Sequence, residues 1–346
     1  MAACGSVTAR DPVTDLRRIA FLLERAHEST YRVRAFRTAA AALRGRTIDE
    51  LTDLALSGEL VRLRGVGEVT ARCVVESLSG EEPGYLRRLQ ESAPNPLADA
   101  AAGVREALRG DCHSHTDASD GGSPLHEMVE TARELGHDYL VITDHSPRLT
   151  VANGLSPERL RRQIEQVGEL NEVLAGTRFR VLTGIEVDIL DDGALDQTEE
   201  LLDQLDVVVA SVHSKLRMPA QEMTERMLTA VANPLVDVLG HCTGRMVTGG
   251  RKRPESQFDA DAVFAACAEY GVAVEVNCRP ERLDPPRRLL RRAVEAGCEF
   301  TIDTDAHAPG QLDWLDYGCT RVAECEVPLE RIRNAWSAER LLAARS

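Results

Sequence analysis

The feature that most limits how this chain can fold is a series of short apolar segments, each ending at an acidic residue or a histidine. Short apolar runs bounded by polar residues are typical of strands buried inside a parallel sheet. In α/β barrels, the residues at the strand ends share one face, where such barrels keep their chemistry. The pattern therefore predicts an α/β barrel with a polar site. The segments are VITDHS, LTGIEVD, VVASVHSK, DVLGHCTG and FTIDTDAH.

Six of the nine histidines lie in these segments or in an earlier one, GDCHSHTDASDG. A single such histidine is more often a hydrogen-bonded core residue, and Asp120-Gly121 could be a simple turn. Taken together, however, the segments favour a metal site, since His113 and His115 would point to one face of a strand. Nine candidate ligands are too many for one ion. They are His113, His115, Asp120, His145, Glu186, His213, His241, Asp305 and His307.

This set of donors suits a particular chemistry. Imidazole and carboxylate groups bind zinc, manganese and iron, and a carboxylate such as Glu186 can bridge two ions about 3.5–4 Å apart. Paired ions hold phosphoryl oxygens and lower the pKa of a bound water toward roughly 7. Hydrolysis of a phosphate ester then needs no nucleophile from the protein.

From Asp111 to about Ile332 the chain resembles the polymerase and histidinol phosphatase (PHP) family of metal-dependent phosphoesterases. The family motifs HxH, SDG, TDH, an E-bearing strand, SVH, GH and DAH occur here in order. The segments SVHSK, GHCTGR, EVNCRPERLD and TIDTDAH are most similar to the PHP domain of bacterial family X DNA polymerases. Cys242 departs from that branch, which usually has proline there. The resemblance implies a distorted (β/α)7-type barrel with phosphatase or 3′-5′ exonuclease activity.

The resemblance also implies three divalent ions, Mn²⁺ and/or Zn²⁺, with iron possible. Asp120 stands where many relatives have histidine, and its oxygen donor favours manganese at the third position. By the resemblance, His113, His115, Glu186 and Asp305 hold the first ion, Glu186, His213 and His241 the second, and Asp120, His145 and His307 the third. Glu186, Asp305 and His213 are expected to be catalytic. The cations expected to bind substrate phosphate, unless they are ordinary surface charges, are Lys215, Arg217, Arg245 and Arg279.

Residues 1–95 are predicted to form a separate all-helical domain, with a linker and short helix over 96–110 and the barrel over 111–346. RLRGVGEVTARCVVESL has the GxG turn of a helix-hairpin-helix, in which Gly65 and Gly67 permit the turn and the next helix offers amides to a DNA phosphate. Such binding does not depend on base sequence. The alternative is a helical docking module whose glycines only form a turn.

This helical region resembles the small amino-terminal domain of family X polymerases over residues 12–90. The lyase chemistry of that family needs a lysine amine. The only lysines of the chain are Lys215 and Lys252, and Cys73 stands near the expected position, so lyase activity is expected to be absent. The stretch before the barrel is too short for a polymerase palm. After Arg321, an amphipathic tail is expected to pack as the last helix.

Composition adds a few limits. The formal net charge of −15 argues against a protein that coats nucleic acid, and residues 1–110 contribute almost nothing to it, with 16 Arg and 15 acidic residues. The nine cysteines include no CxxC pair, and Cys112, Cys242 and Cys278 lie in or near the ligand motifs, which favours a reducing cytoplasm. No apolar stretch is long enough for a membrane span, and the first residues lack a signal-peptide core.

Three functions stay open at this point. The first is a phosphoesterase acting on nucleic acid ends or nucleotides, with the helical domain presenting DNA to the barrel. The second is a small-molecule phosphatase of the histidinol-phosphatase type, and the third is a non-catalytic DNA-binding scaffold.

Overall fold

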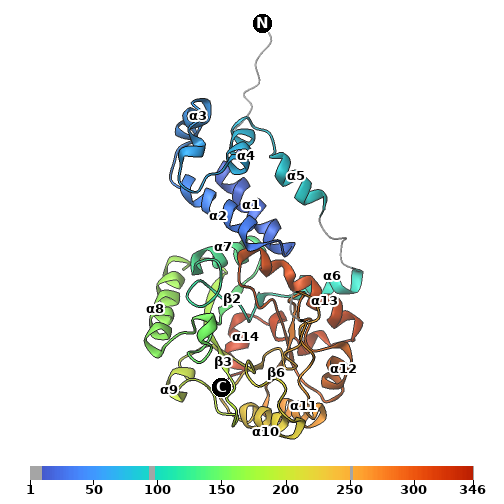
Figure 1. The fold of residues 1–346 in the computed structure, drawn as a ribbon. Coiled ribbons are helices and arrows are strands. Elements are labelled where there is room, and N and C mark those ends of the chain that lie inside the picture. Colours follow the sequence, from blue (N-terminus) through green and yellow to red (C-terminus); the bar gives the residue numbers. More distant parts are fainter. Residues whose placement is uncertain (1–9, 93–97, 250–251, 346) are drawn as a thin grey trace. The chain divides into compact units, whose positions relative to one another are not determined.

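The computed structural model describes residues 10–92, 98–249 and 252–345. The chain divides into two compact units, Met1–Pro96 and Leu97–Ser346 (Figure 1). Among the described residues, none of the helices combines the length and the apolar character that a membrane crossing requires. The eight cysteines in this part of the chain are all free and buried.

The first unit is built from helices packed around the buried face of α1, where Leu16, Ile19 and Leu23 are inaccessible to solvent. Asp11 begins α1 by accepting hydrogen bonds from the amides of Val13 and Thr14. The helices are α1 (Pro12–Arg25), α2 (Thr30–Leu43), α3 (Ile48–Leu56), α4 (Glu68–Leu78) and α5 (Gly84–Glu91), with a 3-10 turn η1 (Leu60–Arg62) before the glycine hairpin.

The hairpin before α4 depends on its first glycine. Gly65 has φ +96°, and a Cβ at this position would lie 2.6 Å from the Cγ2 atom of Thr38. Gly67 caps α4 and has room for a Cβ, and its amide donates to the Thr70 hydroxyl at 3.0 Å. The predicted helix-hairpin-helix geometry is therefore formed, with Gly65 required for the turn itself.

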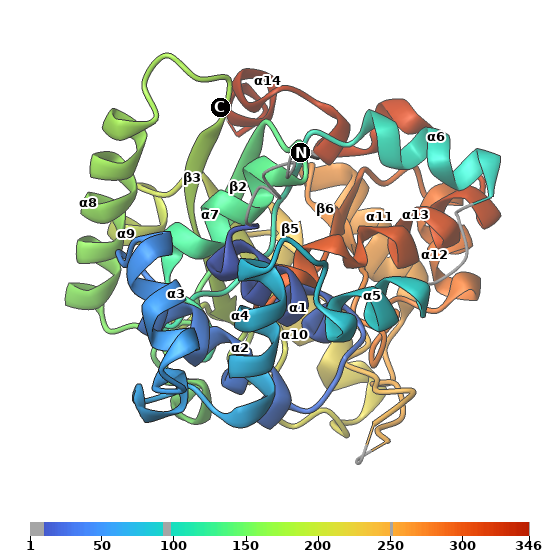
Figure 2. The same cartoon turned by 90° about the horizontal axis from the view of Figure 1, so that it is seen from above.

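The second unit is a nearly closed barrel of seven parallel strands in chain order, with helices around the outside (Figures 1 and 2). This confirms the predicted fold class. The strands are β1 (Gly110–Asp111), β2 (Tyr139–Ile142), β3 (Arg180–Asp188), β4 (Val207–Ser211), β5 (Val238–Leu239), β6 (Ala273–Asn277) and β7 (Phe300–Asp303). The helices are α6 (Asp99–Ala107), α7 (Leu125–Glu134), α8 (Pro157–Val173), α9 (Glu199–Leu202), α10 (Ala220–Val231), α11 (Ala260–Tyr270), α12 (Arg287–Glu295), α13 (Leu315–Glu324) and α14 (Ala338–Ala343).

Side chains close the seam between β1 and β7. The Cys112 amide donates to the Asp303 carboxylate at 2.9 Å, and a single parallel bridge joins Ser114 to Ala306. Asn334 donates to the carbonyls of Gly110 and Ile302 and accepts from the Ile302 amide. The seam is thus held by polar side chains where a continuous ladder of backbone hydrogen bonds is missing.

The segments before and after the barrel strands differ in how they match the sequence analysis. The short helix expected within residues 96–110 is formed as α6, which belongs to the second unit and buries Ala101 in the barrel core. The expected single C-terminal helix is broken into two 3-10 turns, Leu329–Arg331 and Arg333–Ala335, followed by the short α14. At the break, Asn334 is buried at the seam: its carbonyl accepts the amide of Arg109, just before β1, and its side chain bonds to β1 and β7.

Candidate metal centre

The nine candidate ligands come from six different strand ends of the barrel. His113 and His115 follow β1, His145 follows β2, and Glu186 lies near the end of β3. His213 follows β4, His241 follows β5, and Asp305 and His307 follow β7, while Asp120 lies in the loop after β1. Because all strands are parallel, these ends meet at one face of the barrel. The fold therefore gathers residues separated by nearly 200 positions.

Glu186 lies at the centre of the imidazoles. Its Oε2 atom is 3.3 Å from His113 Nε2, 3.6 Å from His115 Nε2 and 2.8 Å from His145 Nδ1. Its Oε1 atom is 2.8 Å from His241 Nε2 and 3.2 Å from His213 Nε2. The two oxygens of one buried carboxylate thus face two separate groups of histidines.

Several of these ring nitrogens have no hydrogen-bond partner in the described part of the chain. They include the Nε2 atoms of His113, His115 and His213, all of which point toward Glu186. An unpaired buried polar atom is costly, and such atoms in a native protein call for a missing partner. A divalent ion provides that partner, so the residues present fit metal binding.

The pKa values at the centre reflect crowded charge. Burial opposes ionisation of Glu186, but the imidazoles of His213, His145 and His113 hold its pKa well below the ordinary value. Burial and the neighbouring His307 and His145 lower the pKa of His115 well below its usual value. His115 is therefore neutral, the form that binds a metal.

A second group forms around Asp120. His307 Nε2 is 3.3 Å from Asp120 Oδ1, and His145 Nε2 is 3.6 Å from the same atom. Together with His115, these residues offer ligand atoms that all lie within 4.8 Å of one another. Gly121 is needed next to them because a Cβ there would lie 2.6 Å from the Thr116 backbone. The Asp-Gly pair is thus both a turn and part of a group that could hold an ion.

Asp305 joins the two groups. Its Oδ1 atom is 3.4 Å from His115 Nε2, and its backbone has φ +51°, a left-handed conformation that is uncommon outside glycine. Burial opposes its ionisation, but Arg279 and His115 lower its pKa well below the usual value. Local backbone strain at a group of charged residues is typical of functional sites.

Two acids that the motifs did not single out support the histidines from behind. Glu275, on β6, lies 2.5 Å from His113 Nδ1 through its Oε1 atom and accepts the amide of His241 at Oε2. Asp188, on β3, is 3.3 Å from His213 Nδ1. Such carboxylates orient metal-binding imidazoles and fix their tautomer. The only sequence signal for Asp188 is its position two residues after Glu186, on the same face of the strand.

Asp144 holds the loop that carries Asp120. It accepts hydrogen bonds from the Thr116 amide at 2.8 Å, the Thr116 hydroxyl at 2.6 Å, and the Ser119 hydroxyl and Gln163 amide at 2.5 Å. Asp144 is inaccessible to solvent. The acid of the TDH motif is therefore placed to position a neighbouring loop.

A cavity of about 300 Å³ opens over these residues and has a basic wall. Arg279 and Arg282 line it, and both contact the Asp305 carboxylate, at 3.4 and 3.3 Å. Of the other cations expected to bind phosphate, Lys215 is 64 % exposed and paired with Asp191, outside the cavity lining. Arg245 donates to the carbonyls of Arg282 and Leu283. The structure brings Arg279 to the cavity and adds Arg282.

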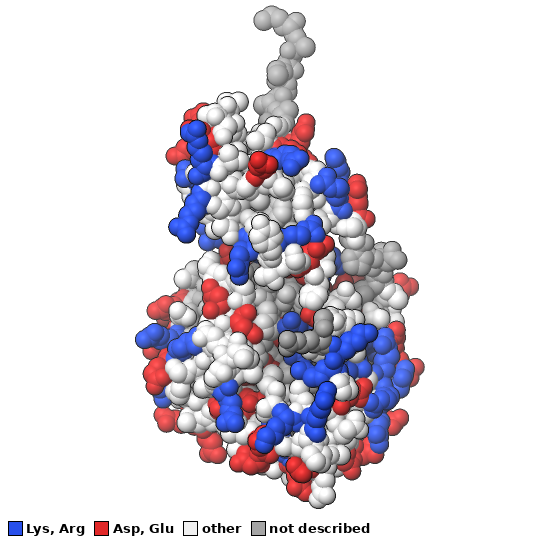
Figure 3. Space-filling model, in the orientation of Figure 1, with Lys and Arg blue, Asp and Glu red and all other residues white. Residues whose placement is uncertain are grey.

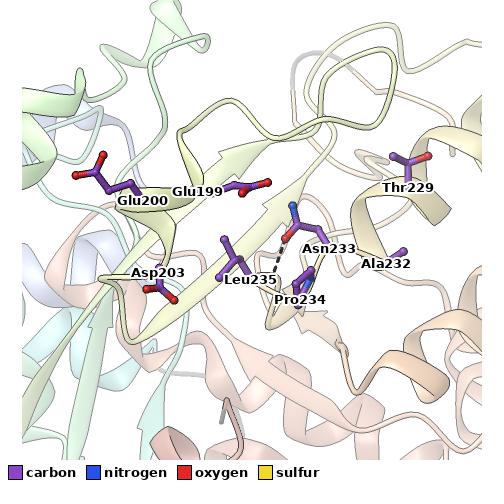
Figure 4. Close-up of a pocket in the computed structure, with 8 residues that line it drawn as sticks. All are labelled: Glu199, Glu200, Asp203, Thr229, Ala232, Asn233, Pro234 and Leu235. Carbon is purple, nitrogen blue, oxygen red and sulfur yellow. Dashed lines mark hydrogen bonds between the residues drawn. The ribbon is translucent and has the colours of Figure 1, made fainter.

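A second hollow lies away from the metal-binding motifs, between α9 and the turn after α10 (Figure 4). Its lining includes the carboxylates of Glu199, Glu200 and Asp203, beside Asn233 and Leu235. None of the nine candidate ligands lines it. The chemistry is therefore expected in the cavity over Glu186.

Fold and site together define a metal-binding α/β-barrel protein with a helical unit before the barrel. Comparison with protein families identifies a PHP domain over residues 111–279 and a helix-hairpin-helix domain over residues 9–82. The chain belongs to the PHP family, which confirms the resemblance seen in its motifs.

Two relatives and one solved structure illustrate the similarity. A DNA polymerase/3'-5' exonuclease PolX from Bacillus subtilis (strain 168) is 38% identical over 230 residues, which is 66% of this chain but only 40% of that protein. A probable phosphatase from Serratia proteamaculans (strain 568) is 31% identical over 247 residues, covering 67% of this chain and 91% of the relative. The crystal structure of histidinol phosphate phosphatase from Lactococcus lactis, complexed with zinc, L-histidinol and phosphate, covers 64% of this chain and 94% of its own, at 18% identity and a TM-score of 0.47.

Proposed function

We propose that this protein is a metal-dependent phosphoesterase that acts on nucleic acid ends or nucleotides. The observation that carries the proposal is the position of Glu186, whose two oxygens face separate groups of imidazoles with unpaired ring nitrogens. Three ions held by the sets given above would supply Lewis acidity and an activated water. Mn²⁺ is the favoured ion near Asp120 because its donor is an oxygen.

The residues of this chain have distinct roles in the proposed reaction. Glu186 and Asp305 place negative charge where the metal ions would bind, and Glu275 and Asp188 keep His113 and His213 in orientation. The guanidinium groups that line the cavity bind the substrate phosphate, since planar guanidinium suits phosphate oxygens.

The helical unit contributes DNA binding in this proposal. The hairpin ends in α4, whose amino-terminal end favours an anion, and Arg64 and Arg72 are exposed beside it. The double substitution Arg64→Ala/Arg72→Ala is expected to weaken binding to short duplex DNA at every sequence alike. The slope of log affinity against log salt should fall by about 1–2. An unchanged slope would assign DNA binding to another part of the chain.

A second candidate is a small-molecule phosphatase, favoured by the limited volume of the cavity, which is close to the lower end for ligand pockets. A substrate panel separates the two. Protein refilled with Mn²⁺ or Zn²⁺ is tested on single-stranded DNA ends, nucleotides and histidinol phosphate, each with and without a chelator. Chelator-sensitive turnover of DNA ends or nucleotides supports the proposal. Turnover of histidinol phosphate alone would replace it with the second candidate.

A further inference from the structure

The barrel carries a basic strip beside the metal cavity. Helix α12 has the sequence RRLLRRAVE, with four arginines and one acidic residue in nine positions. Leu289, Leu290 and Ala293 face the core, while Arg287, Arg288, Arg291 and Arg292 are all exposed. Figure 3 shows a band of Lys and Arg side chains on the lower right of the barrel, in the area where Figure 1 labels α12. This concentration stands out in a chain with a net charge of −15.

A series of contacts links this strip to the cavity. The guanidinium of Arg288 pairs with Glu255, and Glu255 also lies 3.5 Å from Arg245. Arg245 in turn donates to the backbone carbonyl of Arg282, whose side chain lines the cavity. The chain also runs directly from Arg282 into α12, which begins five residues later. Contacts through Glu255 and Arg245 therefore connect the cavity wall with the exposed arginines of α12.

Three of the four arginines of α12 have ion-pair partners on neighbouring segments, and Arg291 donates to the backbone carbonyl of Glu324, yet all four side chains stay accessible. Arg287 pairs with Glu324 and Arg292 with Asp261, and the Arg288 side chain is 62 % exposed. Exposed ion pairs contribute little to stability and are screened by salt. A phosphate can therefore replace a carboxylate at these guanidiniums without loss of structure.

We propose that α12 and the loop before it bind the backbone of a nucleic acid strand whose end enters the metal cavity, an inference that rests on the proposed function. The strip offers guanidinium groups to successive phosphates, and the cavity is too small to hold more than the end of the strand. The barrel thus has its own nucleic acid surface, in addition to any DNA binding by the helical unit.

The test compares two matched double variants of the full chain. Arg288→Ala/Arg291→Ala removes two charges from the strip, and Arg161→Ala/Arg162→Ala removes two exposed arginines from α8 as a control. Binding of a fluorescein-labelled oligo(dT) is followed by anisotropy over a range of NaCl concentrations, with chelator present to prevent cleavage. The strip variant is expected to lower the salt slope by about 1.4, as two lost phosphate contacts on a single strand would, while the control keeps the wild-type slope.

If the two variants have equal salt slopes, or if the wild type does not bind oligo(dT), the proposed nucleic acid binding by α12 is wrong. Unchanged melting temperatures establish that both variants are folded. Turnover of p-nitrophenyl phosphate by the metal-loaded wild type tests the proposed function separately. If the wild type does not turn over p-nitrophenyl phosphate but the strip variant has a reduced salt slope, the proposed enzymatic function is rejected and the nucleic acid surface on α12 is supported. If the wild type turns over p-nitrophenyl phosphate but the strip variant keeps the wild-type slope, only the surface on α12 is rejected.

Discussion

Replacing Glu186 with glutamine should remove more than one metal ion from the protein. The substitution keeps the size of the side chain and deletes its charge. Five of the six imidazoles at the centre lie within 3.6 Å of the Glu186 carboxylate, divided between its two oxygens. Because the two groups share this carboxylate, we expect its loss to weaken the binding of two ions together.

The expected loss of metal affinity in Glu186→Gln can be scaled from the loss of carboxylates that do not contact the metal. Loss of a carboxylate that only orients a ligating histidine weakens metal binding by about 10–100-fold. In the proposed centre Glu186 would contact the ions themselves, so each of two ions should lose at least about 100-fold in affinity. His307→Ala is the comparison, since His307 lies near Asp120 and should chiefly affect one ion.

The assay is elemental analysis after refilling with Mn²⁺ or Zn²⁺ and gel filtration. Glu186→Gln should retain at least two equivalents fewer than wild type, and His307→Ala about one fewer. If Glu186→Gln keeps the wild-type metal content, or if both variants lose the same amount, Glu186 does not bridge two ions.

Three further predictions concern residues behind the metal centre and at the barrel seam. Asp188→Asn should weaken metal binding by about 10–100-fold in a chelator competition, because Asp188 orients His213, and wild-type affinity would contradict this role. In the metal-free protein, Glu186 and Asp188 outweigh burial and raise the pKa of His213 from 6.5 to about 9. Its stabilising contribution should therefore be complete below pH 6.5 and lost as the pH rises through about 9, so the melting-temperature difference between wild type and His213→Gln should shrink over that range. Asn334→Ala should lower the free energy of unfolding, measured with urea, by about 3 kcal/mol, because the buried backbone groups of Gly110 and Ile302 lose their hydrogen-bond partner. A change under about 1 kcal/mol would show that the seam does not depend on Asn334.

Much of the barrel could be predicted because its strands are apolar runs that end in chemically distinctive residues. VITDHS and FTIDTDAH each mark both a buried strand and the polar position after it. Parallel pairing in chain order then brings His145 and His307 to the same face without further information.

What the sequence did not predict depends on contacts between distant segments. Glu275 lies inside β6, whose sequence AVEVN contains no histidine. Nothing in that segment distinguishes a carboxylate that orients a metal ligand from any other buried acid. The C-terminal tail has helical periodicity, yet Asn334 breaks it because its hydrogen bonds to β1 and β7 outweigh local preference. Lys215 directly follows the SVHS segment, but its ammonium group forms an ion pair with Asp191. A charged residue near a candidate ligand in sequence can thus pair with another surface residue and lie outside the site.

In the proposed reaction, metal ions held around Glu186 perform the hydrolysis. We test this by measuring metal content and p-nitrophenyl phosphate turnover on the same samples of wild type and His115→Ala, before and after chelation and refilling. We expect wild-type turnover to fall with metal content, to return on refilling, and to be lost in His115→Ala. Turnover that persists in the metal-free wild type or in His115→Ala, or a fully loaded wild type without turnover, would show that metal ions around Glu186 do not perform the hydrolysis.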